Sequence, residues 1–150
     1  MTNVEVTGTS VSRFSRREIA EFVRKVLIAL DNLGHINAEI SEVSIAMVDD
    51  EAMRTLNRKF RRKNKTTDVL TFPADESDAD PQAQGRPLGD IVISIDQARR
   101  QAADQKHSLA TEIRYLILHG TLHALGHDHE TDDGEMNALE VEVRAAVGLE

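Results

Sequence analysis

Three histidines near the C-terminus have the side-chain type and spacing of metal ligands: His119, His123 and His129. Residues four positions apart on an α-helix share one face, so His119 and His123 can reach one ion from the same side. Gly126 can adopt positive φ, end the helix and turn the chain back, so that His129 can close the site. Three neutral imidazoles leave the fourth position of a tetrahedral zinc open, which is typical of a catalytic site.

The residues around the first two histidines predict a largely apolar helix. Ser108 is a suitable N-cap, and the helix is expected to end near Gly126. Its apolar positions include Ile113, Leu116, Ile117, Leu122 and Leu125. An apolar helix packs into the core, so the metal site is expected at the C-terminal end of a buried helix.

The histidine spacing also resembles the metzincin peptidase signature. In that signature a glutamate follows the first histidine and acts as general base. This chain has Gly120 at that place. Peptide hydrolysis would need another base, so a metallopeptidase is the less favoured alternative.

Two upstream segments accompany the histidine string HGTLHALGHDH. They are LNRKFRRKNKTTDVLTFP at residues 56–73 and LGDIVIS at residues 88–94. In this order and spacing, the three segments resemble the YbeY family of bacterial metal-dependent endoribonucleases, from about residue 40 to the C-terminus. The resemblance implies cleavage of single-stranded RNA, maturation of the 3′ end of small-subunit ribosomal RNA and ribosome quality control.

The resemblance also implies which residues act. Zinc would be bound by the histidines that match His119, His123 and His129, and other divalent metals are possible because imidazole accepts several. A functional arginine in the basic segment corresponds, by its place after the aromatic residue, to Arg61. A guanidinium at the site would neutralise charge that builds up on phosphate oxygens.

Three positions depart from the family pattern. Thr66 stands where proline is usual, Thr71 where serine is common, and His127 where tyrosine is common. The first two are expected to be tolerated changes in a turn and a strand. His127 is expected to be a proton-transfer group or a surface residue, because its two-residue offset from His129 makes joint ligation awkward.

Several acids are candidates for supporting roles. Asp128 and Glu130 flank the third histidine and could orient an imidazole or act as base, or they could be ordinary turn acids. Asp68 and Asp90, at expected strand ends, are weaker candidates. The general base stays open among Asp128, Glu130, His127 and a metal-bound hydroxide.

The net charge of −8 taken alone argues against a nucleic-acid partner. The average hides a basic cluster with no acid inside it: Arg54, Arg58, Lys59, Arg61, Arg62, Lys63 and Lys65. Such a run is often a solvated helix face followed by a lysine-rich turn. Its place inside the family-like segment favours contact with RNA, and arginine can hold a phosphate through two hydrogen bonds.

The expected partners are therefore single-stranded RNA and the ribosomal RNA of the small subunit. Ribosomal proteins and assembly GTPases are further partners that the resemblance allows; DNA and membranes are not expected. A non-catalytic ribosome-assembly factor, in which the metal only holds the fold and the basic cluster only binds RNA, is the alternative to a nuclease.

The whole pattern predicts one compact α+β domain over residues 1–150, a small mixed sheet of about four strands with about five helices. Strands are expected at 3–7, 40–48, 67–72 and 90–94, and helices at 16–32, 50–60, 95–105, 108–126 and 132–146. The acidic segment 74–87 predicts a surface loop, with a lid or strand-pairing arm near the metal as the alternative.

Composition and the first residues of the chain indicate where the protein resides. The chain has no cysteine, its first residues lack the basic and apolar regions of a signal peptide, and no apolar run approaches the roughly 18 residues that span a bilayer. The expected location is the cytoplasm.

Overall fold

The computed structural model describes residues 2–75, 85–128 and 131–149, and the described strands form one four-stranded sheet. The strands are β1 (Asn3–Gly8), β2 (Ile40–Val48), β3 (Val69–Pro73) and β4 (Arg86–Ser94). Their order across the sheet is β1-β2-β4-β3. The β1–β2 and β2–β4 pairs are parallel, whereas β3 runs antiparallel to β4. The sheet is therefore mixed, as predicted, with β3 at one edge.

Five helices connect these strands or follow them in the described part of the chain. They are α1 (Arg16–Asn32), α2 (Asp50–Arg61), α3 (Ile95–Gln105), α4 (Leu109–Ala124) and α5 (Glu135–Val147). The first four begin after a residue whose side chain accepts a hydrogen bond from the backbone N–H three residues on: Ser15, Asp49, Ser94 and Ser108. These caps satisfy N–H groups that a helix leaves without a partner. The prediction of an α+β domain is confirmed.

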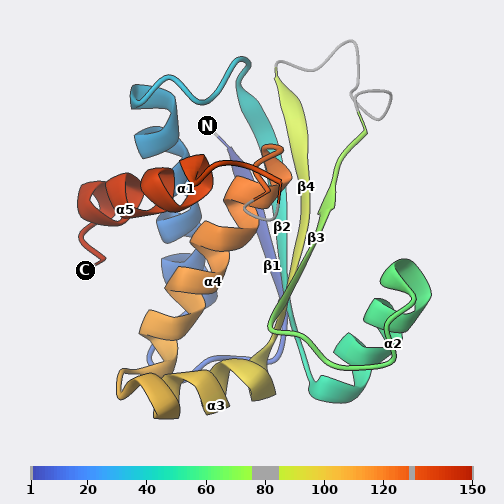
Figure 1. The fold of residues 1–150 in the computed structure, drawn as a ribbon. Helices are drawn as coiled ribbons and strands as arrows, with labels where there is room; N and C mark the ends of the chain where they lie inside the picture. Colours follow the sequence, from blue (N-terminus) through green and yellow to red (C-terminus); the bar gives the residue numbers. More distant parts are fainter. Residues whose placement is uncertain (1, 76–84, 129–130, 150) are drawn as a thin grey trace.

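The two faces of the sheet are covered unequally (Figure 1). Helices α1 and α4 pack on one face, where α5 contacts both of them, and α2 lies on the opposite side. The main core includes Ile45, Ile91 and Ile93 of the sheet together with Ile117 and Leu122 of α4. A smaller cluster of Met53, Leu70 and Val92 lies under α2. None of the described helices is long and apolar enough to cross a membrane.

The start of β4 differs from the sequence prediction. The strand begins at Arg86 instead of residue 90, because the N–H of Arg86 donates to the carbonyl of Glu39 (2.8 Å) and the strand then pairs with β2. Pro87 and Gly89 hid this strand, since both residue types are depleted in strands. Of the loop predicted over 74–87, residues 76–84 lie outside the described residues.

Two other boundaries move because an aspartate acts as a cap. Strand β3 begins at Val69 instead of residue 67, because the carboxylate of Asp68 accepts the N–H of Val69 (2.8 Å). Helix α5 begins at Glu135 instead of residue 132. The carboxylate of Asp132 accepts the N–H groups of Gly134 and Met136 and so belongs to the turn before the helix.

Candidate functional site

Helix α4 ends in the turn that the sequence predicts. Gly126 has φ +98°, and its N–H donates to the carbonyl of His123 (2.9 Å). The N–H of His127 donates to the carbonyl of Leu122 (3.0 Å). These two bonds form a Schellman motif, which satisfies carbonyls that the helix end would otherwise leave open. The turn at Gly126 is confirmed, and the chain leaves the helix beside His123.

The two helical histidines point their ring nitrogens at one place. Nε2 of His119 and Nε2 of His123 are 3.0 Å apart, and the ring centroids are 4.6 Å apart. Two imidazole nitrogens bound to one tetrahedral zinc at 2.0–2.1 Å would lie about 3.3 Å apart. The pair therefore fits two positions of a shared metal ion with a small adjustment of the rings.

A carboxylate on α5 orients the first of these histidines. Nδ1 of His119 lies 2.8 Å from Oε1 of Glu140. A carboxylate only accepts hydrogen bonds, so Nδ1 carries the proton and Nε2 of the neutral ring offers its lone pair. The hydrogen bond to Glu140 raises the pKa of His119, although burial works in the opposite direction. A carboxylate behind a histidine is the usual support of a metal-bound imidazole.

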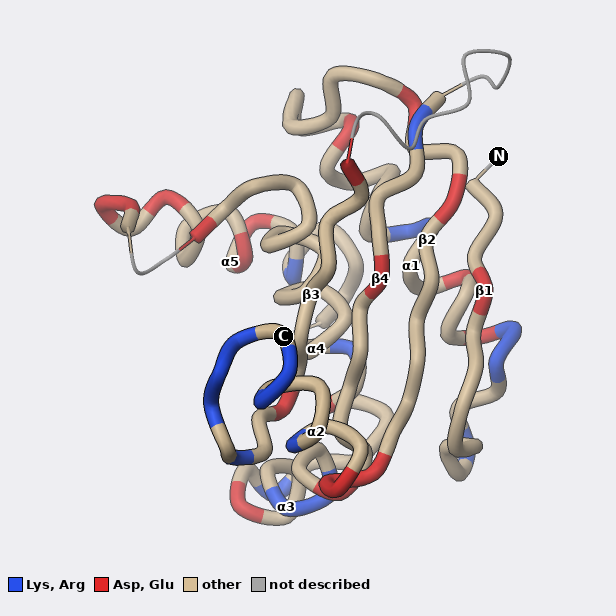
Figure 2. Tube along the Cα trace, turned by 90° about the vertical axis from the view of Figure 1, so that its right-hand side faces the viewer, with Lys and Arg blue, Asp and Glu red and all other residues tan. Residues whose placement is uncertain are grey.

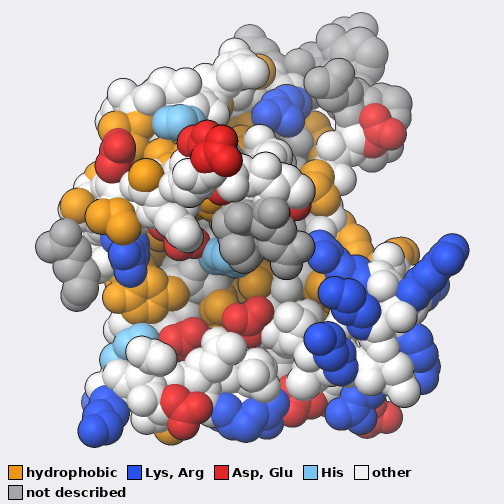
Figure 3. All heavy atoms as spheres, in the orientation of Figure 1, with side chains coloured by type: hydrophobic (Ala, Val, Ile, Leu, Met, Phe, Trp, Pro, Cys, Tyr) orange, Lys and Arg blue, Asp and Glu red, His pale blue; other side chains and the backbone are white. Residues whose placement is uncertain are grey.

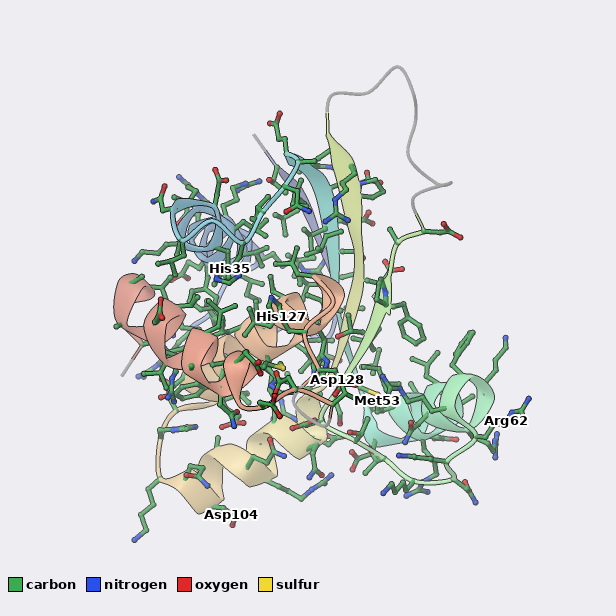
Figure 4. The ribbon with its side chains drawn as sticks, turned by 45° about the horizontal axis from the view of Figure 1, so that its top comes forward. His35, Met53, Arg62, Asp104, His127 and Asp128 are labelled. Carbon is green, nitrogen blue, oxygen red and sulfur yellow. The ribbon has the colours of Figure 1, made fainter. Side chains whose placement is uncertain are left out.

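The structure describes only some of the residues that were predicted to lie around the third ligand. His129 and Glu130 lie outside the described residues, so ligation by His129 stays a prediction. Among the described residues, no group of three or more side chains is arranged to hold a metal. Figure 4 shows Asp128 and His127 in the turn after α4. The ring of His127 contacts that of His35, with centroids 5.7 Å apart.

A cleft of about 280 Å³ opens in front of the histidine pair. It is lined by α4, by β3 with the residues before it, and by α2 with the loop after it: Asn57, Arg61, Lys63, Lys65, Thr67, Asp68, Val69, Leu70, Thr71, His119, His123 and Asp128. The structure thus brings Arg61 to the same cleft as His119 and His123. In Figure 2 the Lys and Arg positions gather along α2 and the loop that follows it, and Figure 3 shows Lys and Arg side chains crowded on this part of the surface.

The basic loop after α2 is folded back by a buried amide that the sequence analysis missed. Asn57 is 2% exposed, and its Nδ2 donates to the carbonyl of Lys65 (2.9 Å). Arg62 adopts a left-handed conformation (φ 58°), and the N–H of Lys63 donates to the carbonyl of Asn57 (3.3 Å). A polar residue one turn after the buried Met53 is the signal that could have revealed this role.

Asp50 joins the other end of the same loop to the sheet. Its carboxylate accepts hydrogen bonds from Thr66 (3.1 Å), Ser94 (3.0 Å) and Arg100 (2.6 Å). Burial acts to raise the pKa of Asp50, but the hydrogen bonds from Arg100, Ser94 and Thr66 together lower it below its ordinary value. Thr66, a departure from the family pattern, supplies a hydroxyl donor that proline does not have.

Gly120 faces the sheet and not the cleft. A Cβ built on it would lie 2.7 Å from Cγ2 of Ile91 and 3.4 Å from Oγ1 of Thr71. The Thr71 hydroxyl donates to the carbonyl of Gly120 (3.4 Å), a contact that serine could also make. A glutamate at position 120 would therefore collide with the sheet instead of reaching the histidine pair. The base of a metzincin peptidase has no room here.

Asp68 and Asp90, the two weaker acidic candidates from the sequence, lie in different parts of the structure. Asp68 lines the cleft, and its other carboxylate oxygen accepts from Nε2 of Gln101 (3.2 Å). Asp90 lines a different hollow, on the open part of the sheet.

Glu140, which orients His119, was not predicted from the sequence. Its place on the buried side of α5, one turn after Met136 and one turn before Val143, is the signal that could have found it.

Fold and site together define a class: a small α+β protein that presents an oriented histidine pair to a basic cleft. A family model described as Endoribonuclease YbeY matches residues 5–148, and the chain belongs to this family. A relative from Nautilia profundicola is 52% identical over 108 residues, covering 72% of this chain and 73% of its own length. One from Acinetobacter baylyi is 43% identical over 123 residues, covering 79% and 77%. Both carry the name Endoribonuclease YbeY.

A solved structure has the same fold. The solution structure of TM1509 from Thermotoga maritima has a TM-score of 0.57 to this chain and covers 97% of it, with 89% of that protein matched. Its sequence identity is 23%, so this likeness supports the fold alone.

Proposed function

We propose that the protein is a zinc-dependent endoribonuclease specific for single-stranded RNA. The observation that carries this proposal is the meeting of the His119 and His123 ring nitrogens with Arg61 in one cleft. Membership of the YbeY family and the name Endoribonuclease shared by its relatives support an RNA substrate.

His119 and His123 would hold the metal, with His129 as the third ligand expected from sequence. A bound zinc ion polarises a phosphoryl oxygen and lowers the pKa of a bound water. The donor set suits zinc, since imidazole is among its preferred ligands. Glu140 would keep the His119 ring in one orientation and one tautomer throughout.

The other cleft residues would bind the substrate and move protons. Arg61 can hold a phosphate through two hydrogen bonds and offset the charge that develops on its oxygens. Lys63 and Lys65 line the same cleft and can neutralise that phosphate or its neighbours. Asp128, also in the cleft wall, could accept a proton, as could Asp68, whose carboxylate already accepts from Val69 and Gln101.

The biological role that we propose follows from the family. The enzyme would mature the 3′ end of small-subunit ribosomal RNA and take part in ribosome quality control in the cytoplasm. Ribosomal proteins or assembly GTPases would bring it to its substrate. Because the cleft is small, about 280 Å³, we expect it to accept one unpaired strand more readily than a duplex.

The test is cleavage of an end-labelled single-stranded RNA by zinc-loaded protein, followed on a gel. We expect His123→Ala to lose both metal and cleavage. Arg61→Ala should keep its metal and lose cleavage by roughly 100-fold or more. Arg17→Ala is the control, because Arg17 is an exposed cation on α1 that lies outside the basic cluster and does not line the cleft.

Two results would contradict the proposal. Equal cleavage by the wild type and His123→Ala would mean that another nuclease is present in the sample. An absence of cleavage, with RNA bound equally well before and after His123→Ala, would instead favour the non-catalytic assembly factor.

A further inference from the structure

An aromatic side chain is exposed in the most basic part of the molecule. Phe60, in the last turn of α2, is 55% exposed. Its neighbours in sequence are Lys59 and Arg61. A single exposed apolar side chain is ordinary, but an aromatic ring among cations combines the two groups that bind the bases and phosphates of a single strand.

The Phe60 ring is held in place by a second aromatic. Its centroid lies 5.1 Å from that of Phe72 in an edge-to-face arrangement, with an angle of 73° between the rings. Nζ of Lys59 lies 5.3 Å from the Phe60 centroid. We call Phe60 and Phe72 the aromatic pair. It is a partly exposed apolar surface with a cation beside it.

The aromatic pair lies beside the cleft without lining it. Phe60 directly precedes Arg61, which lines the cleft, at the end of α2. Phe72 lies on the face of β3 opposite to Thr71, where it packs against the small cluster under α2 and lines a neighbouring hollow. Strand β3 is an edge of the sheet, so the pair is not enclosed by a further strand among those described. Figure 3 shows hydrophobic atoms next to the Lys and Arg side chains on this side of the molecule.

We propose that the aromatic pair is a base-stacking platform for single-stranded RNA. Every base has a π-face that can stack on an aromatic ring, and nearby cations hold the phosphates, which is how proteins bind single strands without reading sequence. In a duplex the bases are already stacked on one another and cannot reach the pair. The platform thus selects unpaired RNA and feeds a neighbouring nucleotide toward Arg61. This inference rests on the proposed function.

The first test uses the absence of tryptophan from the chain. Phe60→Trp introduces a single indole fluorophore, and Val141→Trp is its control, because Val141 is a 53% exposed apolar residue on α5. Each zinc-loaded variant is titrated with a short oligouridine and with a duplex of equal length. We expect the oligouridine to quench the indole emission of the Phe60→Trp variant, and neither RNA to quench that of the Val141→Trp variant.

The second test measures affinity without using activity. Phe60→Leu keeps apolar bulk and removes the π-face, so its Kd for oligouridine should rise roughly tenfold. Its metal content should equal that of the wild type, since Phe60 does not line the cleft. An oligomer with abasic nucleotides should bind the wild type and Phe60→Leu with equal affinity.

The outcomes separate the inference from the function on which it rests. Suppose that the wild type binds oligouridine, but Phe60→Leu binds it equally well or the emission of Phe60→Trp is not quenched. Phe60 then serves only to pack on Phe72, and the platform is overturned. If the wild type binds neither RNA, the proposed function fails as well. Equal quenching of the Phe60→Trp variant by duplex and oligouridine would remove the selectivity for unpaired RNA.

Discussion

The two helices that flank the cleft are built in opposite ways. Helix α4 has nine buried residues and lies in the main core, whereas the buried residues of α2 are Met53 and Asn57. We call α4 with Glu140 the histidine wall, and α2 with residues 62–67 the basic wall. The apolar support of the basic wall comes from the small cluster around Met53, Leu70 and Val92.

This difference matches what each wall is proposed to do. Metal ligands must be held within a fraction of an ångström, which close packing and a supporting hydrogen bond provide. Phosphate contacts through long lysine and arginine side chains tolerate more movement, and a weakly packed segment opens more easily than the core. If the walls are separate in this way, metal binding and RNA binding should respond to different mutations.

The largest effect is expected from filling the space behind the histidine wall. Gly120→Glu places a carboxylate against Ile91 in the core, where burial of an unpaired charge and overpacking should together cost several kcal/mol of unfolding free energy. Gly120→Ala adds the Cβ alone and should cost about 1–3 kcal/mol, partly offset by better helix propensity. Urea denaturation measures both. A Gly120→Glu protein as stable as the wild type would show that position 120 can open toward the cleft.

The next prediction tests whether a change in the histidine wall weakens zinc binding and leaves RNA binding unchanged. Glu140→Gln keeps an acceptor near Nδ1 of His119 but removes its charge, so zinc affinity should fall roughly 10- to 100-fold. Competition with a chromophoric chelator measures this affinity. Glu142→Gln changes an exposed acid on the same helix and should leave zinc affinity unchanged. A large loss of RNA affinity in apo Glu140→Gln would mean that the two walls are not independent.

The sequence predicted the parts of the site that depend on local spacing. His119, His123 and Gly126 belong to one helix and its turn, so helical geometry alone brings the two imidazoles together. The fold was predicted for the same reason, since caps such as Ser15 and Ser108 and the apolar periodicity are local signals.

Contacts between residues that lie far apart in the sequence could not be predicted in the same way. Glu140 reaches His119 only because α5 packs on α4, and no local pattern states which helices pack together. The contact of Asn57 with Lys65 depends on how the loop returns after a left-handed Arg62. The start of β4 at Arg86 depends on its partner β2, which overrides the low strand propensity of Pro87 and Gly89.

A smaller effect is expected on the basic wall. Asn57→Ala leaves the carbonyl of Lys65 without the amide that it now accepts from, so the unfolding free energy should fall by about 1–2 kcal/mol. RNA affinity should also fall, because Lys63 and Lys65 are no longer held toward the cleft, while zinc affinity stays the same. Asn64→Ala, in an exposed position of the same loop, is the control. A loss of zinc from Asn57→Ala would contradict the separation of the walls.

The smallest effect concerns Asp50, which ties the basic wall to the sheet. Its hydrogen bonds hold its pKa below the ordinary value of 3.8, so the ionised form is preferred in the folded protein. The resulting stabilisation is present above that ordinary pKa and is lost as the pH falls through the lower folded-state pKa.

Because Asp50 and Arg100 are 29% and 52% exposed, we expect Asp50→Asn to cost only about 1 kcal/mol of unfolding free energy near neutral pH. In urea denaturation this cost should shrink toward zero below the ordinary pKa, whereas Asp104→Asn, on the exposed side of α3, should show no such change. A cost that is the same at both pH values would mean that Asp50 acts through its shape and not its charge, and that the basic wall is anchored by hydrogen bonds that protonation does not break.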